Sequence, residues 1–169
     1  MSVVRRALPG DAEEVLRLRQ IMIDSMFASD PSVAWHGESL PTLRAELGEP
    51  DGDFTAFVVD HPERPGAPAC LVAGTIDYRI GKAADPQGMV GFVFSVATDP
   101  DARRWGYPLL ERSRELGGGY ARACMTTLLE WFRERGARRV QLTAPPEAEP
   151  LYVSLGFHPK PDPLLELAL

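Results

Sequence analysis

The segment from residue 89 to residue 144 places a long helical pattern between two strand patterns, and this order constrains the fold more than any other feature. The first strand, MVGFVFSVATD (89–99), is the most apolar stretch, which favours a central position. ARRVQLTA (137–144) is the second strand. The helix between them ends at Gly136 and carries one apolar face, formed by Ala121, Cys124, Leu128, Trp131 and Phe132. A strand, helix and strand joined in this way form a right-handed crossover between parallel strands.

Shorter strand and helix patterns surround this crossover. In the first helix, Asp11 is a candidate N-cap and apolar residues recur at helical spacing up to Met26. The remaining elements are expected at 3–7 (strand), 9–27 (helix), 39–48 (helix), 54–60 and 69–81 (a hairpin of two strands around the turn-rich 61–68), 145–157 (loop and short helix) and 163–169 (last strand). The sequence therefore predicts an α/β fold with a mixed, mostly antiparallel sheet, a central β-α-β crossover and helices on both faces.

Length, charge and cysteine content exclude several classes of protein. The 169 residues suit one domain, 1–169, and the net charge of −6 argues against a nucleic-acid binder, whose surface is basic. An acidic balance is compatible with a small amine-bearing partner. No apolar run approaches the roughly 20 residues of a membrane span, so we expect a cytoplasmic location. Cys70 and Cys124 belong to no metal-binding cluster and are expected to be buried and reduced, with no metal bound.

The start of the crossover helix carries the first chemical signal. Glycines at 117–119 precede it, and the N-terminus of a helix offers unpaired N–H groups and partial positive charge to a phosphate. Such a turn alone is a weak signal. A second signal follows the next strand, where LYVSLGF (151–157) places Tyr152 four residues before Gly156.

The turn PDARRWGY (100–107) together with LYVSLGF resembles the GNAT superfamily of acyl-CoA-dependent N-acetyltransferases. The resemblance implies acetyl-CoA as cosubstrate, with the pantetheine arm bonded to the main chain of Val96 and Thr98. It further implies that an N–H at or near Val96 stabilises the oxyanion and that Tyr152 protonates the departing thiolate. A packing role for Tyr152 is the alternative. The residues expected to bind the cosubstrate are Val96, Thr98, Arg103, Arg104, Gly117, Gly118, Gly119, Tyr120 and Ala121.

The phosphate turn departs from the family pattern because Gly-Tyr occurs twice, at 106–107 and 119–120. The lead-in Arg103-x-x-Gly106 is followed by Pro108, which lacks an N–H, whereas the later copy precedes an uninterrupted helix. A thirteen-residue insertion at 108–120 is the simplest account. The helix from 121 to 135 is about 22 Å long, whereas PLLERSREL (108–116) would reach only about 13 Å. We therefore expect the crossover helix to begin near Tyr120 and to meet the phosphate with 117–119.

These observations predict an enzyme that transfers an acetyl group from acetyl-CoA to an amine of a small acceptor. The alternative is a weak or inactive acyl-CoA-binding or interaction module, because the insertion falls in the pyrophosphate loop. The insertion could fold over the cosubstrate, form a homodimer contact or remain a solvated loop. No general base is evident, since Asp24, His36 and Asp77 are weak candidates. The segment 27–40, with Trp35, corresponds to the acceptor-binding loops of the family.

Overall fold

The computed structural model describes residues 4–26, 32–102 and 119–169. Its elements, in chain order, are β1 (Val4–Arg6), the single-turn 3₁₀ helix η1 (Pro9–Asp11), α1 (Ala12–Met26), α2 (His36–Leu47), β2 (Phe54–His61), β3 (Arg64–Tyr78), β4 (Met89–Thr98), α4 (Gly119–Arg135), β5 (Arg139–Leu142) and α5 (Glu149–Ser154). The predictions for Arg103, Arg104, Gly117, Gly118 and the inserted residues up to 118 lie outside the described ranges. The helix predicted to begin near Tyr120 begins at Gly119.

The five strands form one sheet in the order β1-β2-β3-β4-β5. The first four pair antiparallel with their neighbours, whereas β5 pairs parallel with β4, from Val90 opposite Arg139 to Val93 opposite Leu142. The connection between these two parallel strands is α4, so the predicted β-α-β unit is present. The mixed, mostly antiparallel sheet is confirmed. In the part of the chain that the structure describes, β5 forms the edge of the sheet.

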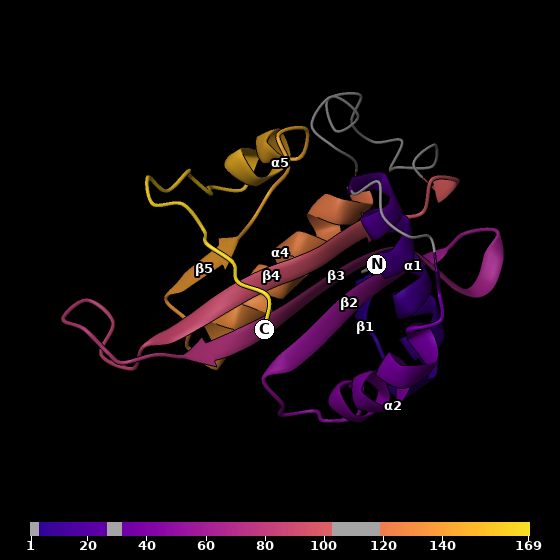
Figure 1. Cartoon of the computed structure of the whole chain (residues 1–169), viewed down its shortest axis with the longest axis horizontal. Helices are drawn as coiled ribbons and strands as arrows, with labels where there is room; N and C mark the ends of the chain where they lie inside the picture. The colour runs from indigo at the N-terminus through magenta and orange to yellow at the C-terminus, as the bar shows by residue number, and fades with distance from the viewer. Residues whose placement is uncertain (1–3, 27–31, 103–118) are drawn as a thin grey trace.

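Two apolar clusters cover the two faces of the sheet. On one face, α4 and α5 pack against β2, β3 and β4 through residues such as Cys124, Leu128 and Tyr152. On the other face, α1 and α2 pack through Leu18 and Leu47. Figure 1 shows α4 lying along the strands, with α1 and α2 next to each other. Strand alternation assigns neighbouring residues of β4 to opposite clusters, so both faces of this strand are buried as the sequence predicts.

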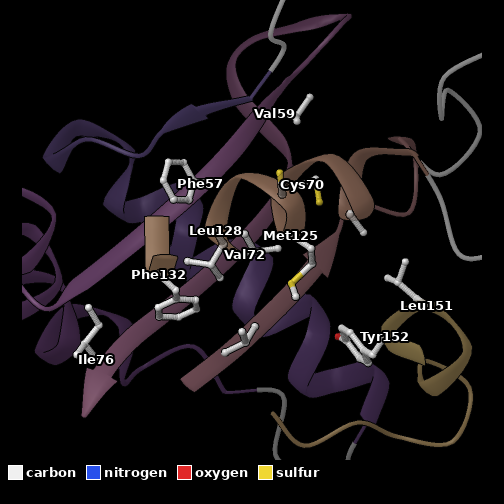
Figure 2. Close-up of a cluster of buried hydrophobic side chains, with 13 residues drawn as sticks. Phe57, Val59, Cys70, Val72, Ile76, Met125, Leu128, Phe132, Leu151 and Tyr152 are labelled. Carbon is white, nitrogen blue, oxygen red and sulfur yellow. The ribbon is translucent and has the colours of Figure 1, made fainter. Parts of the chain in front are cut away.

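Phe132 fixes the position of α4 on the sheet. Its side chain is fully buried in the cluster of Figure 2. A Cβ atom added at Gly91 of β4 would lie 2.7 Å from the ring, and one added at Gly74 of β3 would also lie 2.7 Å from it. The ring therefore occupies the space that side chains at these two glycines would fill. Two residues far from α4 in sequence thus set how closely the helix approaches the strands.

The prediction of a last strand at 163–169 is wrong. Residues 163–169 have no regular secondary structure, and the four leucines of this tail are 73–117 % exposed: Leu164, Leu165, Leu167 and Leu169. Their alternation fits a strand, but a strand forms only when a neighbour accepts and donates its backbone hydrogen bonds. None of the described strands pairs with them. The hairpin turn predicted at 61–68 is also tighter, because β3 already begins at Arg64, opposite His61.

None of the helices in the described ranges is long and apolar enough to cross a membrane.

Candidate functional site

The second half of β4 has a free edge on the side of β5. The parallel ladder ends at Val93 and Leu142, whereas β4 continues to Thr98 without a strand partner on that side among the described residues. On the other side, β3 stays paired as far as Cys70 opposite Thr98. Backbone groups along this edge are therefore available to an extended ligand, as at any unpaired strand edge.

A β-bulge lies in this half of β4. Two residues, Ser95 and Val96, stand opposite the single residue Val72 of β3. Ser95 has a φ of 57°, the only positive φ among the described non-glycine residues. Such a conformation is unfavourable for a side chain larger than glycine and concentrates at functional sites. The bulge therefore marks the point at which β4 leaves β5.

Several of the predicted site residues that the structure describes belong to one apolar cluster or pack against it. Val96 and Tyr120 pack against the same cluster that contains Ala121 and Tyr152. Gly119 is the first residue of α4, and Thr98 ends β4. Figure 2 shows the Tyr152 ring directed from α5 into the cluster, with its hydroxyl on the side of Met125. Val96 of β4, Tyr120 of α4 and Tyr152 of α5 thus share one cluster, although at least 24 positions separate any two of them in the sequence.

Tyr152 combines a packed ring with a hydroxyl that bonds to none of the described residues. The side chain is 6 % exposed, and its ring meets Phe157 edge-on at a centroid distance of 6.0 Å. Burial raises the pKa of the Tyr152 hydroxyl above its usual value, and the nearby Cys70 raises it further. The hydroxyl therefore remains protonated throughout the neutral range. A proton donor is thus held on the α4 face of the site.

The two cysteines meet beneath the site. Cys70 of β3 and Cys124 of α4 are both fully buried free thiols, which confirms the prediction that they are buried. The Thr98 hydroxyl donates to the Cys70 sulfur at 3.5 Å. The hydrogen bond to Cys70 and burial together raise the pKa of the Cys124 thiol. This pairing is not predictable from the sequence, because no spacing rule links a strand residue to a helix residue 54 positions later.

A charged group closes the end of β4. Asp99 is 3 % exposed and lies 2.9 Å from Arg17 of α1, and its carboxylate also pairs with Arg64. Burial opposes ionisation of Asp99, but the backbone N–H of Asp101 and the two guanidinium groups together lower its carboxyl pKa. Arg17 also pairs with Glu14 at 2.7 Å, so its charge is balanced twice. This network fixes α1 to the strand end next to the predicted phosphate turn.

Arg19, two residues further along α1, has a different environment. Its Nη1 donates to the Ser95 hydroxyl at the bulge. No carboxylate of the described residues lies within 4.0 Å of its guanidinium, and the side chain is half-buried. Because α1 covers the face opposite to α4, Arg19 and Tyr152 approach the bulge from opposite sides of the sheet. Arg19 is not predictable as a site residue from the sequence, since a helical arginine is ordinarily a solvent-exposed residue.

The segment predicted to contact the acceptor is tied to α1 through Gln20. The Trp35 Nε1 donates to Gln20 Oε1 at 3.0 Å, and His36 Nε2 lies 3.2 Å from the same oxygen. Because an amide oxygen only accepts, His36 carries its proton on Nε2. The Gln20 Nε2 in turn donates to Asp24 at 2.7 Å. Trp35 is half-buried and hydrogen-bonded. Asp24 and His36, two of the weak candidates for the general base, are both hydrogen-bonded to Gln20.

The third weak candidate, Asp77, lies at the wrong end of the sheet. It pairs with Val90, five residues before Ser95, which is about 17 Å along the strand. Within the described ranges, no group of three or more His, Cys, Asp or Glu side chains could hold a metal ion. The chemistry available here is therefore a protonated phenol, a bulged strand with a free edge, and an arginine without a carboxylate partner among the described residues.

Comparisons with known proteins bear on the fold. No model of a protein family matches the sequence, and no curated protein matches it. Solved structures do match. A predicted acetyltransferase from Clostridium acetobutylicum, crystallised with acetyl-CoA, is similar over 98 % of this chain and 94 % of its own, at 18 % identity and a TM-score of 0.75.

Two further structures agree. A GCN5-related N-acetyltransferase from Ralstonia eutropha JMP134 covers 97 % of each chain at 23 % identity and a TM-score of 0.71. Glucosamine-6-phosphate N-acetyltransferase from Arabidopsis thaliana matches 97 % of this chain and 96 % of its own at 14 % identity, with a TM-score of 0.66. The chain therefore has the fold of the GNAT acetyltransferases, and the fold expected from the sequence resemblance is confirmed.

Proposed function

We propose that this protein transfers an acetyl group from acetyl-CoA to an amine of a small acceptor. The observation that carries the proposal is the convergence of the free β4 edge, the bulge at Ser95 and Val96, and Tyr152. Each has a place in acyl transfer from a thioester: an edge for the extended arm, an N–H for the oxyanion, and a proton for the leaving sulfur. The fold shared with acetyltransferases supports it.

The residues present suit the cosubstrate. Backbone groups of β4 beyond Val93 lack a strand partner on the β5 side within the described ranges, which supports Val96 and Thr98 as the residues that bond an extended pantetheine arm. The N-terminus of α4, at Gly119, Tyr120 and Ala121, packs against the same cluster as Val96 of β4, and a helix N-terminus favours a phosphate. Arg103, Arg104, Gly117 and Gly118 belong to the same proposed binding surface by family resemblance. Acetyl-CoA supplies the activated thioester.

The roles of the chain's own groups follow from this placement. A neutral amine forms the new C–N bond at the thioester carbonyl while an N–H at or near Val96 holds the oxygen. The C–S bond then breaks, and Tyr152 gives its proton to the departing sulfur. The proton lost by the amine passes to water, since Asp24 and His36 are engaged by Gln20. Burial raises the pKa of the Tyr152 hydroxyl above the ordinary tyrosine value of about 10. The hydroxyl therefore still carries its proton at the alkaline pH values at which the amine becomes neutral.

The test combines binding with turnover. Calorimetric titration with CoA measures the cosubstrate half, and mass spectrometry of amines incubated with acetyl-CoA measures transfer. Tyr152→Phe keeps the packed ring, so we expect unchanged CoA affinity and a fall in kcat of about 10-fold or more. Tyr78→Phe is the matched control, because Tyr78 is an exposed tyrosine on β3. Unchanged turnover in Tyr152→Phe would remove its assigned role.

Two other results would point to the alternative stated from the sequence. CoA binding without acetylation of any amine would favour a non-catalytic acyl-CoA-binding module. Absence of CoA binding at millimolar concentration would contradict the proposal as a whole. The acceptor, the homodimer and the cytoplasmic location stay predictions.

A further inference from the structure

The arginines of α1 differ in how their charge is balanced. Arg17 contacts two carboxylates, those of Glu14 and Asp99, and also bonds the Pro68 carbonyl. Arg19 bonds only the Ser95 hydroxyl among the described residues. A guanidinium has five N–H donors, and one hydroxyl oxygen uses only part of them. Arg19 therefore retains donors and a full positive charge.

The position of Arg19 places that positive charge at the bulge of β4. Its side chain contacts the residue next to Val96, at the one bulge in β4 and beside the free edge of the strand. A half-buried charge is screened less by water than an exposed one, so keeping it unpaired costs stability. A plain structural tie between α1 and β4 would not need a charge. An uncharged donor would satisfy the Ser95 hydroxyl equally well.

Arg19 also approaches from the face that suits an acceptor. Tyr152, the proposed acid for the leaving sulfur, reaches β4 from the α4 face, whereas Arg19 reaches it from the α1 face. The amine must reach the carbonyl from a direction that the leaving sulfur does not occupy. In the proposed reaction the α1 face is then the side left to the acceptor, because Tyr152 serves the sulfur from the α4 face.

We infer that Arg19 binds an anionic group, a carboxylate or a phosphate, on the acceptor amine. The inference rests on the proposed acetyl transfer and narrows its substrate class to amines that carry such a group. The planar guanidinium matches either anion with two parallel hydrogen bonds. It adds an anionic group to the amine-bearing partner with which the net charge of −6 is compatible, because local charge at the site outweighs the overall balance.

Paired acceptors test the inference. Acetyl transfer is measured for β-alanine against its amide, and for O-phosphoethanolamine against ethanolamine, so each pair differs in one anionic group. We expect kcat/KM to favour the anionic member of one pair by about 10- to 100-fold, and the preferred pair identifies carboxylate or phosphate. Arg19→Gln should abolish the preference, and Arg19→Lys should retain part of it. Arg44→Gln, which removes the same charge from an exposed pair with Glu13, should leave it unchanged.

A binding measurement keeps this inference separable from the proposed function. N-acetyl-β-alanine and its amide are titrated by calorimetry into wild type, Arg19→Gln and Arg19→Lys, each first shown to be folded by circular dichroism, and N-acetyl-O-phosphoethanolamine is compared with N-acetylethanolamine. Tighter binding of an anionic compound that depends on Arg19 supports the subsite even if no amine is acetylated. Equal binding of both members of each pair, or a preference that survives in Arg19→Gln, overturns it. Acetylation of neutral amines alone would refute the subsite while leaving the acetyl transfer intact.

Discussion

The contact between Gly91 and Phe132 predicts that Gly91→Ala destabilises the protein. The added Cβ would lie 2.7, 2.8 and 2.9 Å from three atoms of the Phe132 ring. Phe132 is fully buried, so the ring cannot turn away into solvent. Crowding of this kind costs about 1–3 kcal/mol, and the lower backbone entropy of alanine returns about 0.5–1 kcal/mol. Because three ring atoms are contacted, the cost lies in the upper half of that range, and the free energy of unfolding should fall by about 1–2 kcal/mol.

Urea unfolding followed by circular dichroism measures this change, and Tm should fall by about 3–6 °C for a chain of this length. Gly10→Ala is the matched control, because a Cβ at Gly10 meets nothing within 4 Å. A double mutant adds a sharper test. If the ring is the obstacle, Gly91→Ala combined with Phe132→Leu should cost less than the sum of the single changes by about 1 kcal/mol. Strict additivity, or a Gly91→Ala variant as stable as wild type, would refute the reasoning.

Two further predictions concern charge and the chain end. Asp99 has a lowered folded-state pKa, so the stability it provides is present above pH about 4 and is lost as pH falls through its folded pKa. Asp99→Asn should lower the free energy of unfolding at pH 7 by about 1–3 kcal/mol and flatten its decline below pH 4, measured by urea unfolding at pH 7 and pH 3; parallel pH profiles would contradict this. A chain ending at Asp162 loses four exposed leucines and should change the free energy of unfolding by less than about 0.5 kcal/mol in the same assay, whereas a loss above about 2 kcal/mol would mean that the tail packs on the protein.

Elements whose residues show a clear local pattern are predictable from the sequence. The crossover helix was placed by its apolar spacing and by the length needed to span the sheet, and it begins one residue from the predicted start. The parallel pairing of β4 with β5 followed from that helix. The last strand failed for the opposite reason. The alternating leucines of 163–169 satisfy a strand pattern, but pairing depends on a neighbour that the pattern does not specify.

The residues of the candidate site fall into the same two groups: those that a local motif names, and those that only the fold brings together. Tyr152, Val96 and Thr98 are named by a motif resemblance, and their roles stay predictions; Val96 packs against the cluster that contains Tyr152. Arg19 and the Cys70–Cys124 contact were missed because each depends on two elements meeting across the fold. Arg17 and Arg19 are both arginines of α1, so residue type does not distinguish them. They differ in the side chains that surround them. Their distinction required the side-chain contacts of β4 and of Asp99.

The buried cysteine pair makes local opening of the protein measurable by thiol labelling. Cys70 on β3 and Cys124 on α4 are both inaccessible while the helix rests on the sheet. A thiol-specific reagent can reach them only when this packing opens, so its rate of reaction reflects the free energy of opening. Because the Thr98 hydroxyl at the end of β4 bonds the Cys70 sulfur, a ligand that occupies this end of β4 should slow the labelling. Opening of the core is thus measurable at the native cysteines, with no cysteine introduced by mutation.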